Sequence, residues 1–340
     1  MDTIATASAL DRRDLFQETA NWRGLSPLVI EKDFWVCWTL KQMFALPSLG
    51  PNLIFKGGTS LSKVFRLIER FSEDIDLSLR RDYLGFSGEN DPEQAASKNQ
   101  QRNRVLALRE KCRLVVQNEV KEALTAAFQQ VLGTEAWSLE SDPDDENTLN
   151  FTYPAAIASD APGATYIRRK VKLEMGAGSD PYPIGTHSIQ PYAAEELPSA
   201  FTAPACDVIV MEAERTFWEK ATLLHTEYHR PEDKPTPIRL SRHYYDLMRV
   251  AASETGARAI ADQNLLARVA AHKSVYFASN WAHYETARPG SLHILPAPER
   301  LEDVQRDYAG MQDMFFDSYP TFEELLAATT DLEQRINSSV

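Results

Sequence analysis

Long hydrophobic runs are absent from this 340-residue sequence. No stretch approaches the ~18 consecutive apolar residues that a bilayer-spanning helix requires, and the N-terminus lacks the basic segment and apolar core of a secretory signal. Cysteine is scarce, since Cys37, Cys112 and Cys206 are widely spaced and form no CxxC pair. Neither a disulfide framework nor a zinc site is indicated. We therefore expect a cytoplasmic protein with free thiols and no membrane partner.

Several common catalytic motifs are also missing. The segment GGTSLSK at 57–63 has the wrong spacing for a Walker A loop, and the chain contains no GxGxxG motif, so neither P-loop nor Rossmann chemistry is indicated. No HExxH motif and no Ser/His/Asp nucleophile elbow are present.

Basic residues are outnumbered, with 36 Lys and Arg against 49 Asp and Glu, which gives a formal net charge of -13. The molecule as a whole should repel polyanions, and this argues against a protein that coats DNA. A local basic cleft with divalent cations would still allow an enzyme to handle nucleotides or RNA.

The N-terminal part alternates helices and strands. Apolar residues recur at three- and four-residue intervals over 10–47, which predicts helices. After the break at PSLGPN, we expect a strand at 53–58 that runs into paired glycines, a helix at 60–71 and a second strand at 72–79.

The remaining elements are predicted from the same patterns. Residues 92–131 have helical periodicity and form an insertion between strands, and 136–175 resemble a hairpin with the acidic loop DPDDEN on the way. The proline-rich segment 179–207 is expected to be an irregular connection leading out of the sheet. From 211 onward the chain is helix-rich.

Two carboxylates dominate the strand SEDIDLSL. Its alternation places Asp74 and Asp76 on one face, about 7 Å apart, and apolar side chains on the other. Carboxylates this close can share divalent cations. Taken alone, such a pair is more often an exposed and solvated strand face.

A second predicted strand, YIRRKVKLEMG at 166–176, shows the same alternation of charged and apolar residues. Glu174 lies on the face of Arg168, Lys170 and Lys172, with apolar residues at 167, 171, 173 and 175 opposite. If the two strands are neighbours, Glu174 completes a three-carboxylate set able to hold two hard cations. Such a set supports metal-assisted phosphoryl or nucleotidyl transfer.

A glycine pair precedes the first carboxylates. Gly57 and Gly58 follow the apolar strand directly, and Thr59 and Ser60 open the next helix, so backbone N–H groups and hydroxyls converge where a phosphate could bind. The simpler alternative is a tight turn with Thr59 or Ser60 as a helix cap.

The segment KGGTSLSKVFRLIERFSEDIDLSL resembles the first motif of the AbiEii/AbiGii-type nucleotidyltransferase toxins, within the DNA polymerase beta-like superfamily. Further similarity covers about residues 30 to 315. It includes EKDFWVCWTL, KVKLEMG, ERTFWEKATLLHTEYHR followed by RHYYDL, YFASNWAHYE and DYAGMQDMFF.

The resemblance implies roles for named residues. Gly57, Gly58 and Thr59 or Ser60 would contact nucleotide phosphates, while the metal ligands would be Asp74, Asp76 and Glu174. Lys220 would touch phosphates and Asp246 would lie at the site, so that both join the catalytic set with the three carboxylates. Lys56 and Lys172 complete the nucleotide-binding set.

The residues themselves leave alternatives open for the later motifs. Lys220 lies on an apolar helix stripe, where it either meets an anion or extends along the stripe to solvent. Asp246 lies between Arg242 and Arg249, which is compatible with a surface ion pair. The bases from Arg168 to Lys172 either line an entry for a polyanionic substrate or are solvated charges at a sheet edge.

We therefore expect an α+β fold, with a polymerase beta-like mixed sheet and flanking helices at 1–200 and a helical domain at 201–340 that closes the cleft. The resemblance implies two Mg²⁺ ions, with Mn²⁺ as an alternative, an NTP substrate, and a toxin of a toxin–antitoxin or phage-defence system with a cognate antitoxin. The acceptor would be RNA such as a tRNA 3′ end. Transfer to a protein hydroxyl and a non-catalytic nucleotide-binding regulator are the alternatives.

Overall fold

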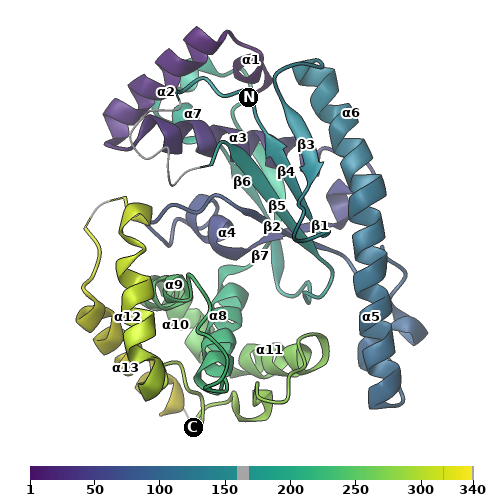
Figure 1. The fold of residues 1–340 in the computed structure, drawn as a ribbon, viewed down its shortest axis with the longest axis vertical. Coiled ribbons are helices and arrows are strands. Elements are labelled where there is room, and N and C mark those ends of the chain that lie inside the picture. The colour runs from purple at the N-terminus through teal and green to yellow at the C-terminus, as the bar shows by residue number, and fades with distance from the viewer. Residues whose placement is uncertain (159–167, 317, 339–340) are drawn as a thin grey trace.

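The computed structural model describes residues 1–158, 168–316 and 318–338, and within these ranges it contains one mixed seven-stranded sheet (Figure 1). The strand order is β3-β4-β5-β2-β1-β7-β6. β2 pairs in parallel with β5 and β1 in parallel with β7, while the other neighbours are antiparallel. The strands are β1 (Leu53–Lys56), β2 (Ile75–Leu79), β3 (Ser138–Ser141), β4 (Thr148–Thr152), β5 (Lys170–Gly176), β6 (Ile184–Ile189) and β7 (Cys206–Met211).

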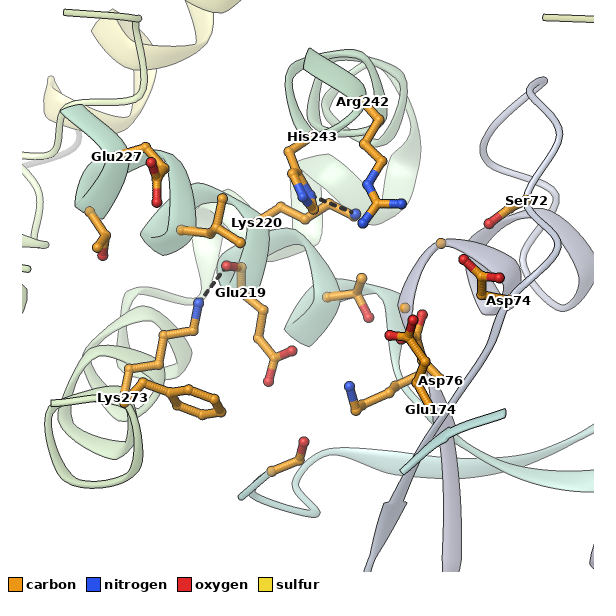
Figure 2. A pocket seen from close by; sticks show the side chains of 18 of the residues that line it. Ser72, Asp74, Asp76, Glu174, Glu219, Lys220, Glu227, Arg242, His243 and Lys273 are labelled. Carbon is orange, nitrogen blue, oxygen red and sulfur yellow. Dashed lines mark hydrogen bonds between the residues drawn. The ribbon is translucent and has the colours of Figure 1, made fainter. Parts of the chain in front are cut away.

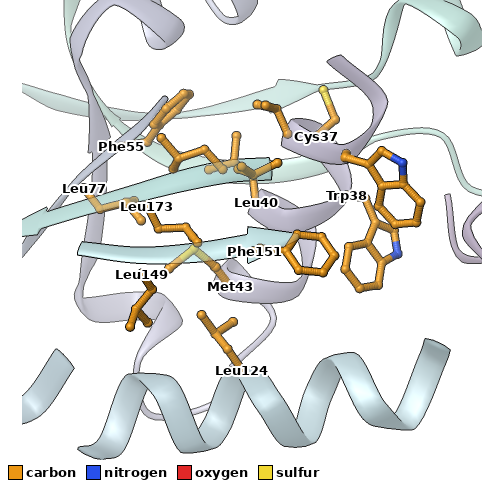
Figure 3. Close-up of a cluster of buried hydrophobic side chains, with 14 of the residues drawn as sticks. Cys37, Trp38, Leu40, Met43, Phe55, Leu77, Leu124, Leu149, Phe151 and Leu173 are labelled. Atoms are coloured by element: carbon orange, nitrogen blue, oxygen red, sulfur yellow. The ribbon is translucent and has the colours of Figure 1, made fainter. Parts of the chain in front are cut away.

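The N-terminal helices pack on the sheet. Helix α3 begins with the capping hydroxyl of Ser26 and with Pro27 at its first turn, and it is buried along most of its length. Trp35 and Trp38 pack against Phe151 of β4 in the first hydrophobic core (Figure 3). These helices are α1 (Asp2–Ala5), α2 (Ala9–Arg23), α3 (Pro27–Phe44) and, later in the chain, α7 (Tyr192–Glu196).

The insertion predicted at 92–131 is helical. It consists of α5 (Lys98–Val115), one π-helical turn (Val116–Val120) and α6 (Lys121–Leu132), and it forms a long helical rod beside the sheet (Figure 1). Short 3₁₀ turns occur at Gly50–Asn52, Gly88–Asn90, Pro92–Gln94, Pro198–Ala200, Tyr284–Thr286, Pro298–Arg300 and Gln312–Met314.

The C-terminal helices form a second hydrophobic core. Among the described residues, no helix is long and apolar enough to cross a membrane. The helices are α8 (Ala213–Tyr228), α9 (Ser241–Ala251), α10 (Glu254–Ala261), α11 (Gln263–Tyr276), α12 (Leu301–Ala309) and α13 (Phe322–Asn337).

Three sequence predictions need correction. The segment 179–207 is not an irregular exit from the sheet, because it contains β6 and the start of β7, which lies beside β1 in the sheet. The sheet therefore continues past residue 200 to Met211. The division into domains at 1–200 and 201–340 stays a prediction. The hairpin predicted at 136–175 also has a third strand, β3, and Ile167 lies outside the described residues.

The helix predicted at 60–71 ends early. Helix α4 spans only Gly57–Lys63, and the chain then runs irregularly to β2. Its apolar residues serve two cores, because Ile68 packs in the C-terminal core and Phe71 in the sheet core. Phe71 N also donates to Met314 O at 2.6 Å, so this segment links the two halves of the chain.

Candidate active site

A cavity of about 400 Å³ lies between the centre of the sheet and helices α8, α9 and α11 (Figure 2). The sheet side contributes Gly57, Gly58 and the predicted carboxylates. The helical side contributes three cationic side chains, Lys220, Arg242 and Lys273, together with the carboxylates Glu219 and Glu227. The predicted residues that line it are Lys56, Gly57, Gly58, Asp74, Asp76, Glu174 and Lys220.

The three carboxylates are brought together by the strand register. β2 and β5 are parallel neighbours with Asp76 directly opposite Glu174, and Asp74 comes just before β2. Burial and the neighbouring carboxylates Glu73 and Glu174 raise the pKa of Asp74. Burial also raises the pKa of Asp76, and the nearby Lys56 offsets this only in part. A fully solvated strand face is therefore the wrong interpretation.

The three carboxylates are chemically suited to a divalent cation, although their side chains do not surround a common metal position. Hard cations prefer oxygen ligands, and a bound cation would offset the repulsion between neighbouring carboxylates. Among the described residues, no three His, Cys, Asp or Glu side chains are close enough to hold a metal. Glu174 instead accepts a hydrogen bond from Lys172 at 2.5 Å. Glu174 would have to leave Lys172 to join Asp74 and Asp76 as a ligand.

The glycine turn has two separate steric requirements. Gly57 has φ of +79°, and a Cβ at this position would lie 2.0 Å from Asp76 Oδ2. A Cβ at Gly58 would lie 2.9 Å from both Arg70 Nη2 and Ser72 Oγ. The absence of side chains therefore lets the turn backbone approach the carboxylates and the cavity.

Thr59 and Ser60 do not line the cavity with their hydroxyls. Thr59 is buried and its Oγ1 donates to Asp74 O at 2.5 Å, while the buried Ser60 Oγ donates to Gly57 O at 2.8 Å. Both hydroxyls stabilise the turn and the start of β2. The cavity-lining hydroxyl in this region is that of Ser72, which the sequence patterns did not identify.

Lys220 and Asp246 form a buried triad with Arg70. Arg70 Nε and Nη2 donate to the two carboxylate oxygens of Asp246 at 2.6 and 2.7 Å, and Lys220 Nζ lies 2.8 Å from Asp246 Oδ2. Lys220 thus meets an anion and does not extend to solvent. Asp246 is fully buried, so a surface ion pair with Arg242 or Arg249 is the wrong interpretation.

Electrostatics in the triad favour the ionised carboxylate. Burial alone would raise the pKa of Asp246, but Arg70 and Lys220 outweigh it and hold that pKa well below its ordinary value. Burial and the adjacent Arg70 lower the pKa of Lys220. Asp246 is absent from the cavity lining, and it positions Lys220, which does line the cavity.

The helical wall carries further cations that sequence reasoning missed. Arg242 and Lys273 line the cavity, and burial lowers the pKa of Lys273 to about 8. Burial and the nearby Lys220 hold the pKa of His243 well below its ordinary value, so its neutral Nδ1 accepts from Lys220 at 3.3 Å. The Nε of Arg242 is buried without a hydrogen-bond partner among the described residues, so an anion would satisfy it.

The row of bases on β5 is not at a sheet edge, because β5 lies between β4 and β2. Lys172 pairs with Glu174, and Arg168, Lys170 and Lys172 line a separate cavity of about 340 Å³ beside Asp74. The role predicted for these bases as an entry for a polyanion stays a prediction.

Fold and site combine carboxylates on the central strands with a glycine turn, the arrangement that the sequence analysis expected of a nucleotidyltransferase. A family model described as "Nucleotidyl transferase AbiEii toxin, Type IV TA system" matches residues 38–328. The chain therefore belongs to this family of nucleotidyltransferase toxins of type IV toxin–antitoxin systems, which implies an NTP substrate and an antitoxin partner. Enzymes of the family generally use divalent metal ions.

A solved structure supports the fold. The chain is similar to MenT4, nucleotidyltransferase toxin Rv2826c from Mycobacterium tuberculosis H37Rv, at 18% identity and a TM-score of 0.52, over 96% of this chain and 90% of that chain. Comparison with curated protein sequences finds no match.

Proposed function

We propose that this toxin transfers a nucleoside monophosphate from an NTP to the 3′ end of an RNA such as tRNA, with Mg²⁺ as the divalent ion. The observation that supports this proposal is that Asp74, Asp76 and Glu174 face cations of α8, α9 and α11 in one cavity (Figure 2). In the reaction, the acceptor hydroxyl oxygen bonds to the α-phosphorus and the bond from that phosphorus to the pyrophosphate oxygen breaks, so that pyrophosphate leaves and the hydroxyl proton is released to solvent.

The cationic wall would hold the triphosphate tail. The triad of Arg70, Lys220 and Asp246 has two cations for one carboxylate, so it carries an excess positive charge next to the cavity. Arg242 adds a buried Nε that lacks a partner among the described side chains. Phosphate oxygens would satisfy both, since charge-assisted hydrogen bonds to phosphate are among the strongest in proteins.

The carboxylates would hold the divalent ions. Asp74 and Asp76 would be the ligands available without rearrangement, and Glu174 would join them once it separates from Lys172. When bound, Mg²⁺ supplies charge neutralisation at the phosphates and lowers the pKa of the attacking hydroxyl. The protein's own contribution is then to bind the triphosphate, orient it and position the acceptor.

Labelling with each α-³²P-NTP in turn tests the proposal. The purified protein is incubated with Mg²⁺ and with total RNA or protein from a bacterial extract. We expect label in RNA of tRNA size, and a loss of at least about 100-fold in Asp76→Asn. The matched control is Asp82→Asn, which changes an exposed aspartate paired with Arg80 just after β2. Its labelling should equal that of the wild type.

Two results would contradict parts of the proposal. Label on protein alone, including on the antitoxin, would replace RNA as the acceptor. Equal labelling by Asp76→Asn and Asp82→Asn, both shown to be folded by circular dichroism, would remove the carboxylates from the chemistry. Experiments in cells test the proposed role in phage defence. Expression of the toxin should arrest growth, and the antitoxin should relieve this arrest. In cells that carry both, phage infection should trigger the arrest.

A further inference from the structure

A second cavity of about 360 Å³ adjoins the first across the carboxylates. The residues that line both cavities are Lys56, Asp76, Glu174, Ser179 and Phe277. The two cavities therefore adjoin each other at Asp76 and Glu174. A molecule that reacts beside these carboxylates can extend into both.

The second cavity differs in chemistry from the first. Its lining includes five apolar side chains, Val105, Leu108 and Cys112 of α5 and Met175 and Ala177 at and just after the end of β5. Arg109, Asp145 and Asn147 add polar groups to it. The first cavity has the cations Lys220, Arg242 and Lys273, and none of these three lines the second. Phosphates therefore favour the first cavity, and a flat, largely apolar group favours the second.

Phe277 lies where the two cavities meet. It directly follows α11, and half of its surface is exposed (50%) although most large apolar side chains of this chain are buried. Its ring lies against the backbone at Gly178, where a Cβ would be 3.4 Å from Phe277 Cζ. The rim of the ring therefore lies close to the backbone at Gly178, and half of the residue's surface remains exposed to a ligand.

Contacts from the segment around α5 hold Tyr276, the residue that precedes Phe277. Arg109 of α5 donates to Tyr276 O at 2.6 Å, and Tyr276 OH donates to Asp91 at 3.3 Å. The guanidinium of Arg81 lies 4.6 Å from the centroid of the buried Tyr276 ring. The helical insertion therefore both lines the second cavity and fixes the residue next to Phe277.

The geometry points to a nucleobase subsite in the second cavity, in which a base stacks on Phe277 while phosphates occupy the first cavity. This inference rests on the proposed function, since it places a base next to the reacting phosphate. The base comes either from the incoming NTP or from the terminal nucleotide of the acceptor RNA. Stacking on an aromatic ring is the interaction that every nucleobase can make.

Steady-state kinetics with Phe277→Ala, Phe277→Leu and Phe277→Trp test this subsite. Phe277→Ala should raise one Michaelis constant by about 5- to 150-fold, the range for loss of one base stack. Phe277→Leu restores apolar volume but no ring, so it should bind as weakly as Phe277→Ala. Phe277→Trp keeps an aromatic ring, so it should retain binding. Trp22→Ala is the matched control, since it removes an exposed aromatic side chain (71% exposed) outside both cavities.

The two sources of the base are distinguished by which constant changes. A rise in KM for the NTP alone identifies the base of the donor, and a rise in KM for the RNA alone identifies the base of the acceptor. Unchanged constants in Phe277→Ala, or equal binding by Phe277→Leu and the wild type, would overturn the inference. Equilibrium titration with NTP and with short RNA gives the same comparison without turnover, so failure of the subsite is separable from failure of the transfer reaction.

Discussion

Replacement of Asp246 by Asn tests the buried triad that joins the two halves of the protein. Asp246 has no exposed surface, and the side chains of its partners Arg70 and Lys220 are only 2% and 8% exposed. Asn keeps the shape but removes the charge, so two cations remain buried without their carboxylate. Such a loss of one partner costs about 3–5 kcal/mol.

The expected effect is large compared with the total stability. A cost of about 4 kcal/mol changes the folding equilibrium about 1,000-fold. For a chain of 340 residues it corresponds to a fall in Tm of about 6 °C. Because Lys220 loses its anchor beside the cavity, KM for the NTP should rise as well. Urea denaturation followed by tryptophan fluorescence measures the change in the free energy of unfolding.

Glu69→Gln is the matched control. Glu69 pairs with Arg249, but both side chains are exposed (64% and 37%), so its loss should cost less than about 1 kcal/mol. Equal stability of Asp246→Asn and Glu69→Gln would refute the reasoning, because it would mean that the triad is effectively solvated.

The contribution of Asp246 to the free energy of unfolding should depend on pH in a definite direction. Since folding lowers the pKa of Asp246, its stabilisation is complete above about pH 4 and is lost as the pH falls below that value.

Two further predictions concern the cavity. Gly57→Ala should reduce kcat by at least about 100-fold while the protein stays folded, because a Cβ would clash with Asp76 Oδ2 at 2.0 Å; full activity would show that the turn is free to move. In the wild type, kcat/KM for the NTP should fall above about pH 8 as Lys273 loses its proton. Lys273→Met should have a lower kcat/KM that stays flat in this pH range, and a retained fall would assign the titration to another group.

The sheet was predictable where the pattern was local. Alternation identified β2 and β5, and helical periodicity identified the insertion. The strand β7 was missed because a proline-rich context outweighed its apolar run VIVM at 208–211, which is typical of a strand within a sheet. The edge strand β6 has a weaker pattern, because its polar residues Thr186, His187 and Ser188 are consecutive and leave neither face fully apolar.

The carboxylates of the site were predictable, and most of its cations were not. A period of two residues orients Asp76 and Glu174, and the parallel pairing of β2 with β5 then places them opposite each other. Arg70 lies in a segment with helical spacing that in fact packs into two different cores, so its direction could not be inferred. Arg242 and Lys273 reach the cavity only through the tertiary packing of α9 and α11.

The overall charge of -13 does not describe the cavity. Charges are screened beyond about 8 Å at physiological salt, so a bound group responds to its immediate neighbours. The cavity lining has five cationic side chains and five carboxylates, segregated in part between the helices and the sheet: Lys56, Arg70, Lys220, Arg242 and Lys273, and Asp74, Asp76, Glu174, Glu219 and Glu227. The carboxylates at the strands require a cation and the cationic wall requires an anion. A nucleoside triphosphate with its divalent metal supplies both in one complex.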